Sequence, residues 1–312
     1  MPVSERAAAD PTEATPSAGL AVDAALLTMA LFWATNMVVL KSLLAVLPPP
    51  ALSAARFALV SLLAMAVAAS RREPKTIDRG DWLRLVGSAL CGITFYQILF
   101  MEGLERTTAF TSNLMQGTEP LLALFLLSLT GAAAVQPRQW GGVLLSFLGA
   151  VLFFLQDAGS GAALAFGSGD ALNLASAIVF AVYGLLCGPL FRRYPGSTAM
   201  AWTMGAGTLP LCLWAYPVMR SVDWLRLGPV VWGELVFSSV LPVYVGYWIW
   251  NWAIARKGLA HASLYIFVDI VVTGVFAYFF LGERFGALRL TGASVILLGV
   301  HLARAGEPPH PE

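Results

Sequence analysis

The chain consists of long apolar stretches separated by short polar breaks. Ten stretches are long enough to cross a bilayer, because a membrane-spanning helix needs about 20 apolar residues. The breaks carry Pro, Gly or charge, as in LPPP at 47–50 and RREPKTIDRGD at 71–81. The pattern predicts an all-α integral membrane protein with about ten transmembrane helices, over residues 20–41, 50–70, 83–103, 107–130, 137–156, 169–191, 198–219, 229–253, 259–281 and 286–304.

The composition supports this class and argues against others. Hydrophobic residues make up 58% of the chain and charged residues 12%, and the mean hydropathy is +0.74. Soluble domains carry about twice that charged fraction. A net charge of +1 with no basic stripe excludes a nucleic-acid partner. Cys91, Cys187 and Cys212 lie in apolar stretches without a CxxC pair, so we interpret them as buried apolar side chains.

The two ends of the chain predict tails rather than structure. Residues 1–19 are rich in Ala, Pro, Ser, Thr and acids and lack the apolar core of a secretory signal, which predicts a disordered cytoplasmic tail. Residues 305–312 form a second short tail. With the N-terminus in the cytoplasm, twelve Lys and Arg residues fall on the inner side and six on the outer side. The positive-inside rule therefore predicts that both termini are cytoplasmic.

Residues 20–156 and 169–304 are predicted to be two copies of one five-helix unit. At an offset of about 150 residues, FMEGLERTTAFTSNLMQGTEP aligns with WNWAIARKGLAHASLYIFVDI. This register pairs Glu119 with Asp269, and further along it pairs two glycines of each copy, Gly142 with Gly292 and Gly149 with Gly299. An odd number of helices per copy inverts the second copy in the membrane. Inverted repeats are typical of secondary transporters, whose substrate site lies near the midplane between the halves.

Several segments, in this order, resemble the EamA type of the drug/metabolite transporter superfamily. They are LFWATNMVVLK (31–41), ARF (55–57), TEPLLALFLL (118–127), FVDIVVTGVFAYFFLGE (267–283) and LTGASVILLGV (290–300), and the resemblance covers about residues 20–304. It implies ten helices, export or exchange of metabolites across the bacterial inner membrane, and no cofactor. One departure is Ile270, which stands where the family usually has proline, as Pro120 does in the first half. A helix break like the one expected at Pro120 therefore cannot be assumed in the second half.

Polar and aromatic side chains within the spans are candidates for a transport pathway, because polar groups in a membrane are costly and commonly functional. Glu119 and Asp269 lie mid-helix at equivalent positions. A medium of low dielectric favours the protonated form of a carboxylate, so both are candidates for proton coupling; the alternative is a structural acid. The full set of pathway candidates is Trp33, Asn36, Gln97, Gln116, Glu119, Phe180, Tyr183, Tyr247, Asn251, Tyr265 and Asp269.

Three other residues have expected positions that the structure can test. We expect Arg56 to reach the outer surface or to pair with Glu102, in a structural role. His261, at the cytoplasmic end of the ninth span, is expected to be exposed to solvent. Trp250 is expected to belong to an interfacial aromatic belt.

Taken together, these patterns favour a secondary transporter, an exporter or exchanger of small amphipathic metabolites such as amino acids. A passive facilitator or channel of the same fold is an alternative. An intramembrane enzyme is disfavoured, since the sequence has neither HExxH nor GxSxG, and no catalytic or metal-binding residue is predicted. The expected partners are a small-molecule substrate and the lipid bilayer. A homodimer through the Gly-rich fifth and tenth spans stays open.

Overall fold

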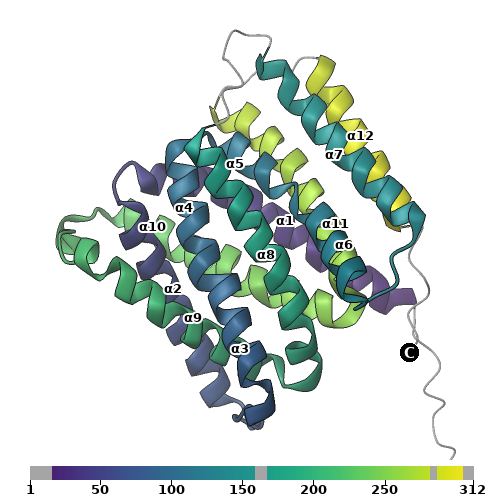
Figure 1. Cartoon of the computed structure of the whole chain (residues 1–312). Helices are drawn as coiled ribbons and strands as arrows, with labels where there is room; N and C mark the ends of the chain where they lie inside the picture. The colour runs from purple at the N-terminus through teal and green to yellow at the C-terminus, as the bar shows by residue number, and fades with distance from the viewer. Residues whose placement is uncertain (1–15, 159–166, 282–286, 305–312) are drawn as a thin grey trace, which may run out of the picture.

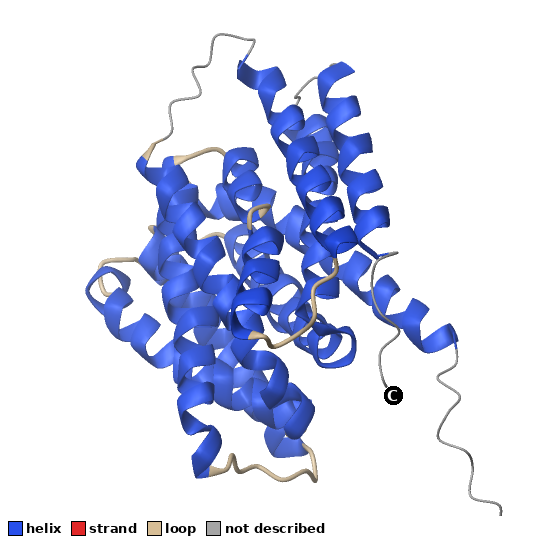
Figure 2. Ribbon diagram, turned by 45° about the vertical axis from the view of Figure 1, so that its right-hand side comes forward, coloured by secondary structure: helices blue, strands red, loops and turns tan. Residues whose placement is uncertain are grey.

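The computed structural model describes residues 16–158, 167–281 and 287–304, and all of the regular structure in these ranges is helical (Figures 1 and 2). The predicted tails over 1–19 and 305–312 lie outside these ranges except for residues 16–19, which belong to the first helix. The helices are α1 (Pro16–Leu44), α2 (Pro49–Ser70), α3 (Trp82–Ala89), α4 (Tyr96–Arg106), α5 (Ala109–Gln116), α6 (Glu119–Thr130), α7 (Pro137–Ala158), α8 (Ser168–Arg193), α9 (Gly196–Met219), α10 (Pro229–Ser238), α11 (Gly246–Leu281) and α12 (Ala287–Arg304).

These helices follow the ten predicted stretches. Two π-helical segments connect consecutive helices without a break. The segment η2 (Leu90–Phe95) joins α3 to α4, and η4 (Ser239–Val245) joins α10 to α11. The described segments that are long and apolar enough to cross a membrane are Gly19–Leu44, Pro49–Ser70, Arg79–Arg106, Ser168–Arg193 and Pro229–Phe276. The last has 48 residues and contains two of the predicted spans.

The breaks in the helices follow from proline and glycine. Gly258 divides α11 into two spans with φ of 80° and ψ of 167°, a backbone conformation that side chains with a Cβ rarely adopt. Between α5 and α6 the helix is interrupted at Gly117 and Thr118, just before Pro120, which lacks an N–H to continue the helix. Ile270 lies within continuous helix, so the break of the first half has no equivalent at the matching position of α11.

The fifth and tenth predicted spans pack against each other. Helices α7 and α12 lie side by side at the edge of the bundle in both ribbon views (Figures 1 and 2). A Cβ at Gly142 would lie 2.6 Å from the carbonyl oxygen of Gly299, and one at Gly149 would lie 2.8 Å from that of Gly292. The glycine face that could serve a homodimer is therefore occupied within one chain, and the homodimer stays a prediction.

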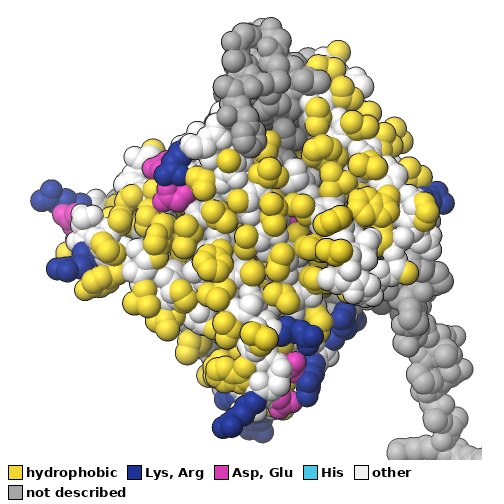
Figure 3. Space-filling view, viewed as in Figure 1, with side chains coloured by type: hydrophobic (Ala, Val, Ile, Leu, Met, Phe, Trp, Pro, Cys, Tyr) yellow, Lys and Arg dark blue, Asp and Glu magenta, His cyan; other side chains and the backbone are white. Residues whose placement is uncertain are grey.

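Apolar side chains cover the outside of the bundle as well as its core. Leu62, Leu129, Leu209 and Leu213 are each more than half exposed, as expected for side chains that face lipid. Figure 3 shows apolar side chains across the middle of one face, with Lys and Arg at its lower and left-hand edges. This band is the distribution that a bilayer requires.

Ion pairs join the segment between α2 and α3 to the end of α8. Arg193 forms ion pairs with Asp81 at 2.7 Å and with Asp78 at 2.6 Å, and the Tyr194 hydroxyl donates to Asp81 at 2.7 Å. Partial burial, together with this hydrogen bond, raises the pKa of Tyr194 above its ordinary value. The loop between α2 and α3 is thereby held against the junction of α8 and α9.

Candidate functional site

A cavity of about 60 Å³ lies between the two repeats. That volume has room for several water molecules or the polar head of a small ligand. Helices of both halves contribute to its wall, which consists of Trp33, Asn36, Met37, Arg56, Tyr96, Gln97, Phe100, Asn113, Gln116, Phe180, Pro242, Val243, Tyr247, Ile266 and Asp269. Seven of the eleven predicted pathway residues belong to this list: Trp33, Asn36, Gln97, Gln116, Phe180, Tyr247 and Asp269. Glu119, Tyr183, Asn251 and Tyr265 do not.

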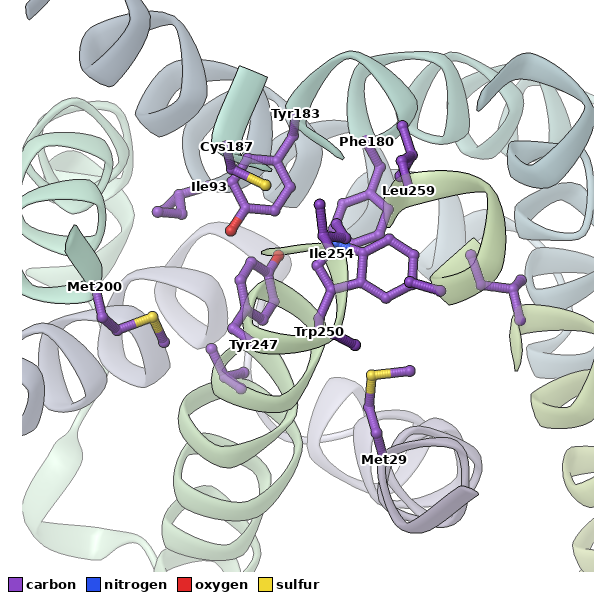
Figure 4. Packing of buried hydrophobic residues seen from close by; sticks show 14 of the residues in the cluster. Met29, Ile93, Phe180, Tyr183, Cys187, Met200, Tyr247, Trp250, Ile254 and Leu259 are labelled. Carbon is purple, nitrogen blue, oxygen red and sulfur yellow. The ribbon is translucent and has the colours of Figure 1, made fainter. Parts of the chain in front are cut away.

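Aromatic rings form one side of the cavity, with Phe180 of α8 at their centre. Its ring centroid lies within 4.7–6.1 Å of those of Tyr96, Trp250, Tyr183, Trp33 and Tyr247. Figure 4 shows the rings of Phe180 and Trp250 facing each other beside Tyr247. Trp250 is fully buried, so its expected place in an interfacial belt is wrong. The π-helical segment η4 precedes it, and the helical register after that segment turns Trp250 towards the core.

The two π-helical segments give backbone oxygens to this aromatic group. Trp33 of α1 donates from Nε1 to the carbonyl oxygen of Pro242 in η4 at 2.9 Å. Tyr247 donates its hydroxyl to the carbonyl oxygen of Gly92 in η2 at 2.8 Å. A π-helical turn weakens the regular helical pairing, and such turns are frequent at functional sites. Both segments occupy matching positions in the repeats, and each holds a cavity residue in place.

Polar side chains of α5 and α11 also line the cavity, and hydrogen bonds join them to neighbouring hydroxyl groups. Asn113 of α5 donates to the Thr273 hydroxyl at 2.8 Å, and that hydroxyl donates to Asp269 of α11 at 3.3 Å. Gln116 donates to the Ser176 hydroxyl of α8 at 2.7 Å. The short helix α5, which ends at the break before Pro120, is thereby fixed to both α8 and α11.

The two predicted proton-coupling acids lie in different surroundings. Asp269 is 4% exposed and lines the cavity. Glu119 is fully buried, and in the described part of the chain neither of its carboxylate oxygens has a hydrogen-bond partner. The matching positions in the two repeats therefore differ in access to the cavity, and the coupling role of each stays a prediction.

The remaining pathway candidates are buried away from the cavity wall. Tyr183 donates its hydroxyl to Asn251 at 2.7 Å, and both side chains are fully buried. Tyr183 also contacts Phe180, so this pair supports the aromatic wall from behind. Tyr265 is 2% exposed and packs against the ring of His261, with centroids 5.7 Å apart.

Arg56 does not lie where the sequence led us to expect it, at the outer surface or paired with Glu102. It is 1% exposed and lines the cavity, and its Nη2 donates to the carbonyl oxygen of Ser238 at 3.1 Å. The expected partner Glu102 instead pairs with Arg106 at 2.6 Å. Helix α10 presents its last carbonyl to α2, and this contact draws the guanidinium inwards. The sequence did contain a signal for this position, because a charged residue within an apolar span usually faces the interior of the bundle.

A second polar cluster joins α1 to the start of the ninth span. His261 Nε2 lies 2.8 Å from an oxygen of Asp23, and Lys257 Nζ lies 3.2 Å from the same oxygen. His261 is 1% exposed, so the expected exposure to solvent is wrong; α1 covers this end of α11 and supplies the carboxylate. A further cavity of about 260 Å³ borders this end, and Lys257 lines it together with Arg192. No three His, Cys, Asp or Glu side chains among the described residues could hold a metal ion.

Comparison with known proteins identifies the family. A model of the EamA-like transporter family matches residues 20–155 and again residues 167–304. An "Uncharacterized transporter" of Archaeoglobus fulgidus is 28% identical over 284 residues, covering 89% of this chain and 95% of that relative. A "Probable terminal-alkyne amino-acid exporter" of Streptantibioticus cattleyicolor is 28% identical over 247 residues, covering 78% of this chain and 80% of that relative.

The fold is also found among solved structures. One crystal structure matches with a TM-score of 0.72 at 18% identity, over 92% of this chain and 97% of that chain. At this identity the match concerns the fold alone. The two matches of the family model cover both repeats and nearly all of the described helices. The chain therefore belongs to the EamA-like transporter family and is a multi-pass membrane transporter.

Proposed function

We propose that the protein is a secondary transporter, an exporter or exchanger of small amphipathic metabolites such as amino acids. It would work by alternating access in the bacterial inner membrane with both termini in the cytoplasm. The observation that carries this proposal is the cavity between the two repeats. Its wall combines aromatic rings with polar side chains that include Asn113, Gln116 and Asp269. Such a wall suits a ligand with an apolar part and a polar head.

Two further points support an amino acid as the ligand. One relative bears the name of an amino-acid exporter, and it shares 28% identity over 78% of this chain. Arg56 is the single Lys or Arg side chain in the described cavity wall, and Asp269 is the single acidic one. A phosphate ester would bring two negative charges to this balanced pair of groups, whereas a zwitterion brings one charge of each sign.

Proton coupling is the finer part of the proposal. Asp269 lines the cavity, so its ionised form can attract a cationic group of the substrate, and its protonated form cannot. A proton and a substrate that compete for one carboxylate are exchanged across the membrane in opposite directions. Glu119 is the second candidate because it is buried at the matching position of the first repeat. A passive facilitator of the same fold would transport without either acid.

Counterflow in proteoliposomes tests the proposal. Vesicles with purified protein are loaded in turn with unlabelled amino acids, amines and nucleosides, and uptake of the matching labelled compound is measured. We expect uptake of at least one amino acid above that of protein-free vesicles, with a strong loss in the Glu119→Gln/Asp269→Asn double variant. Uptake that is insensitive to a pH gradient and to both substitutions would favour the facilitator. No uptake of any compound by folded protein would contradict the proposal.

A further inference from the structure

The guanidinium of Arg56 is buried with unused hydrogen-bonding capacity. The side chain is 1% exposed, and only Nη2 has a partner, the carbonyl oxygen of Ser238. Nε and Nη1 are also buried, and neither has a hydrogen-bond partner in the part of the chain that the structure describes. Arginine stays protonated in proteins. A buried positive charge with free donors is costly unless an anion meets it, which indicates a ligand rather than a structural contact.

Asp269, the acidic residue of the same cavity wall, does not form an ion pair with Arg56. Asp269 comes from α11 and Arg56 from α2, and both line the cavity. Among the described residues no ion pair joins either of them to an oppositely charged side chain. Tyr96 lines the same cavity as both of them. Two opposite charges that share one small cavity without pairing are complementary to a ligand with two charges.

We infer that Arg56 and Asp269 form a receptor for an α-amino acid, in which Arg56 binds the carboxylate and Asp269 the ammonium group. Nη2 carries a second hydrogen besides the one that it donates to Ser238. Together with the free donor of Nε or of Nη1, it presents the planar fork that binds a carboxylate through two hydrogen bonds. The side chain of the ligand lies against the rings of Phe180 and Tyr96, which line the cavity, and this gives a preference for apolar and aromatic amino acids. This inference rests on the proposed transport function and adds the residues that recognise each charge.

Truncated ligands separate the two charges in an experiment. L-phenylalanine has both groups, phenethylamine lacks the carboxylate, and 3-phenylpropionate lacks the ammonium group; L-leucine, isoamylamine and 4-methylpentanoate form a parallel series. Binding is measured as thermal stabilisation of the full-length protein in detergent, and transport as counterflow in proteoliposomes. The wild type should bind each amino acid about 10- to 100-fold more tightly than either truncated analogue, as expected for loss of a charge-assisted hydrogen bond.

The variants are Arg56→Gln, Arg56→Lys and Asp269→Asn. Arg56→Gln should bind L-phenylalanine and phenethylamine alike, because the carboxylate has lost its receptor. Asp269→Asn should lose the preference for L-phenylalanine over 3-phenylpropionate. Arg56→Lys keeps the charge but not the fork, so it should retain part of the carboxylate preference and show that the Arg56 variants fold. Arg226→Gln, at a side chain exposed in a loop, is the matched control and should behave as the wild type.

The outcomes distinguish this inference from the proposed function. Undiminished preference for the carboxylate in Arg56→Gln, with wild-type transport intact, overturns the inference and leaves the transporter in place. Wild-type counterflow of amines or nucleosides, without binding of either amino acid, also overturns it. Binding of L-phenylalanine that depends on Arg56, without counterflow, supports the receptor and counts against the transport function.

Discussion

Helices α7 and α12 present the same glycine-lined face to each other, whereas the preceding spans of the two repeats differ in both backbone and chemistry. In the first repeat that span is broken into α5 and α6, and Glu119 is enclosed. In the second it is continuous helix, and Asp269 reaches the cavity. The packing of α7 against α12 thus keeps the symmetry of the repeat. The spans that carry Glu119 and Asp269 depart from that symmetry, and only Asp269 of the two lines the cavity.

The largest expected effect tests the symmetric region. A Cβ at Gly299 would lie 2.5 Å from the carbonyl oxygen of Gly142, and one at Gly149 would lie 2.6 Å from the backbone nitrogen of Ile296. Because the obstructing atoms are backbone, Gly299→Val and Gly149→Val should each lower the free energy of unfolding by about 3 kcal/mol or more. Thermal unfolding in detergent measures the loss.

The repeat symmetry makes that first prediction sharper. Gly149 and Gly299 occupy matching positions, so their valine variants should be destabilised to a similar extent. Gly141→Val is the control on the same helix, at an exposed position where the nearest atom to an added Cβ is 4.0 Å away. A large loss for one variant and none for the other would show that α7 and α12 do not meet symmetrically.

The second prediction concerns the helix break. Ile270 is fully buried in continuous helix, so Ile270→Pro removes a helical hydrogen bond and should cost about 3 kcal/mol of stability. Pro120 lies in the first turn of α6, where no such bond is lost, so Pro120→Ala should change stability by less than about 1 kcal/mol. Thermal unfolding of both variants measures the difference. Equal losses would mean that the break is not set by the proline.

The third prediction separates the two acids by transport. Asp269→Asn removes a charge from the cavity wall and should lower counterflow by about 10-fold or more, as for a lost charge-assisted hydrogen bond. Glu119→Gln is nearly isosteric, and neither oxygen of Glu119 loses a hydrogen-bond partner among the described residues, so counterflow should change by less than about 3-fold.

The response of counterflow to a pH gradient is the control for the comparison of Asp269→Asn with Glu119→Gln. If Asp269 carries the proton, stimulation by a gradient persists in Glu119→Gln and disappears in Asp269→Asn. The reverse result would assign proton coupling to Glu119, the enclosed acid.

These differences show which features a sequence can predict. Apolar runs and Pro or Gly breaks predicted the helices, and the register of the repeat paired Glu119 with Asp269, because these features depend on local composition and spacing. The inward orientation of the Arg56 side chain depends on its hydrogen bond to the carbonyl oxygen of Ser238, at the end of α10. The burial of His261 depends on Asp23, more than 200 residues away. Contacts between distant segments of this kind leave no local pattern.

Trp250 illustrates a second limit on what the sequence can predict. A π-helical segment adds a residue to the helical turn and shifts the face that every later side chain presents. Positions after η4 therefore cannot be assigned to a face by regular helical spacing from α10. The sequence has one pointer, Pro242 within the segment, but proline alone is equally consistent with a kink.

The smallest expected effect tests the pair of π-helical segments. Trp33→Phe removes the hydrogen bond to Pro242 in η4, and Tyr247→Phe removes the one to Gly92 in η2. Each variant leaves a carbonyl oxygen without its side-chain donor, so each should lower the free energy of unfolding by about 1 kcal/mol. Tyr244→Phe, at a half-buried tyrosine one turn before Tyr247, is the matched control and should cost less.

Transport decides whether these bonds only support the fold. If the two segments act as matching hinges, the Trp33→Phe and Tyr247→Phe variants should bind L-phenylalanine with nearly unchanged affinity but exchange it at altered rates. Each substitution frees the backbone of one π-helical segment, whereas Arg56 and Asp269, the charged groups that hold the ligand, are unchanged. Matching changes in affinity and rate would instead place both side chains among the groups that contact the ligand. A change in only one variant would mean that the two repeats use their π-helical segments differently.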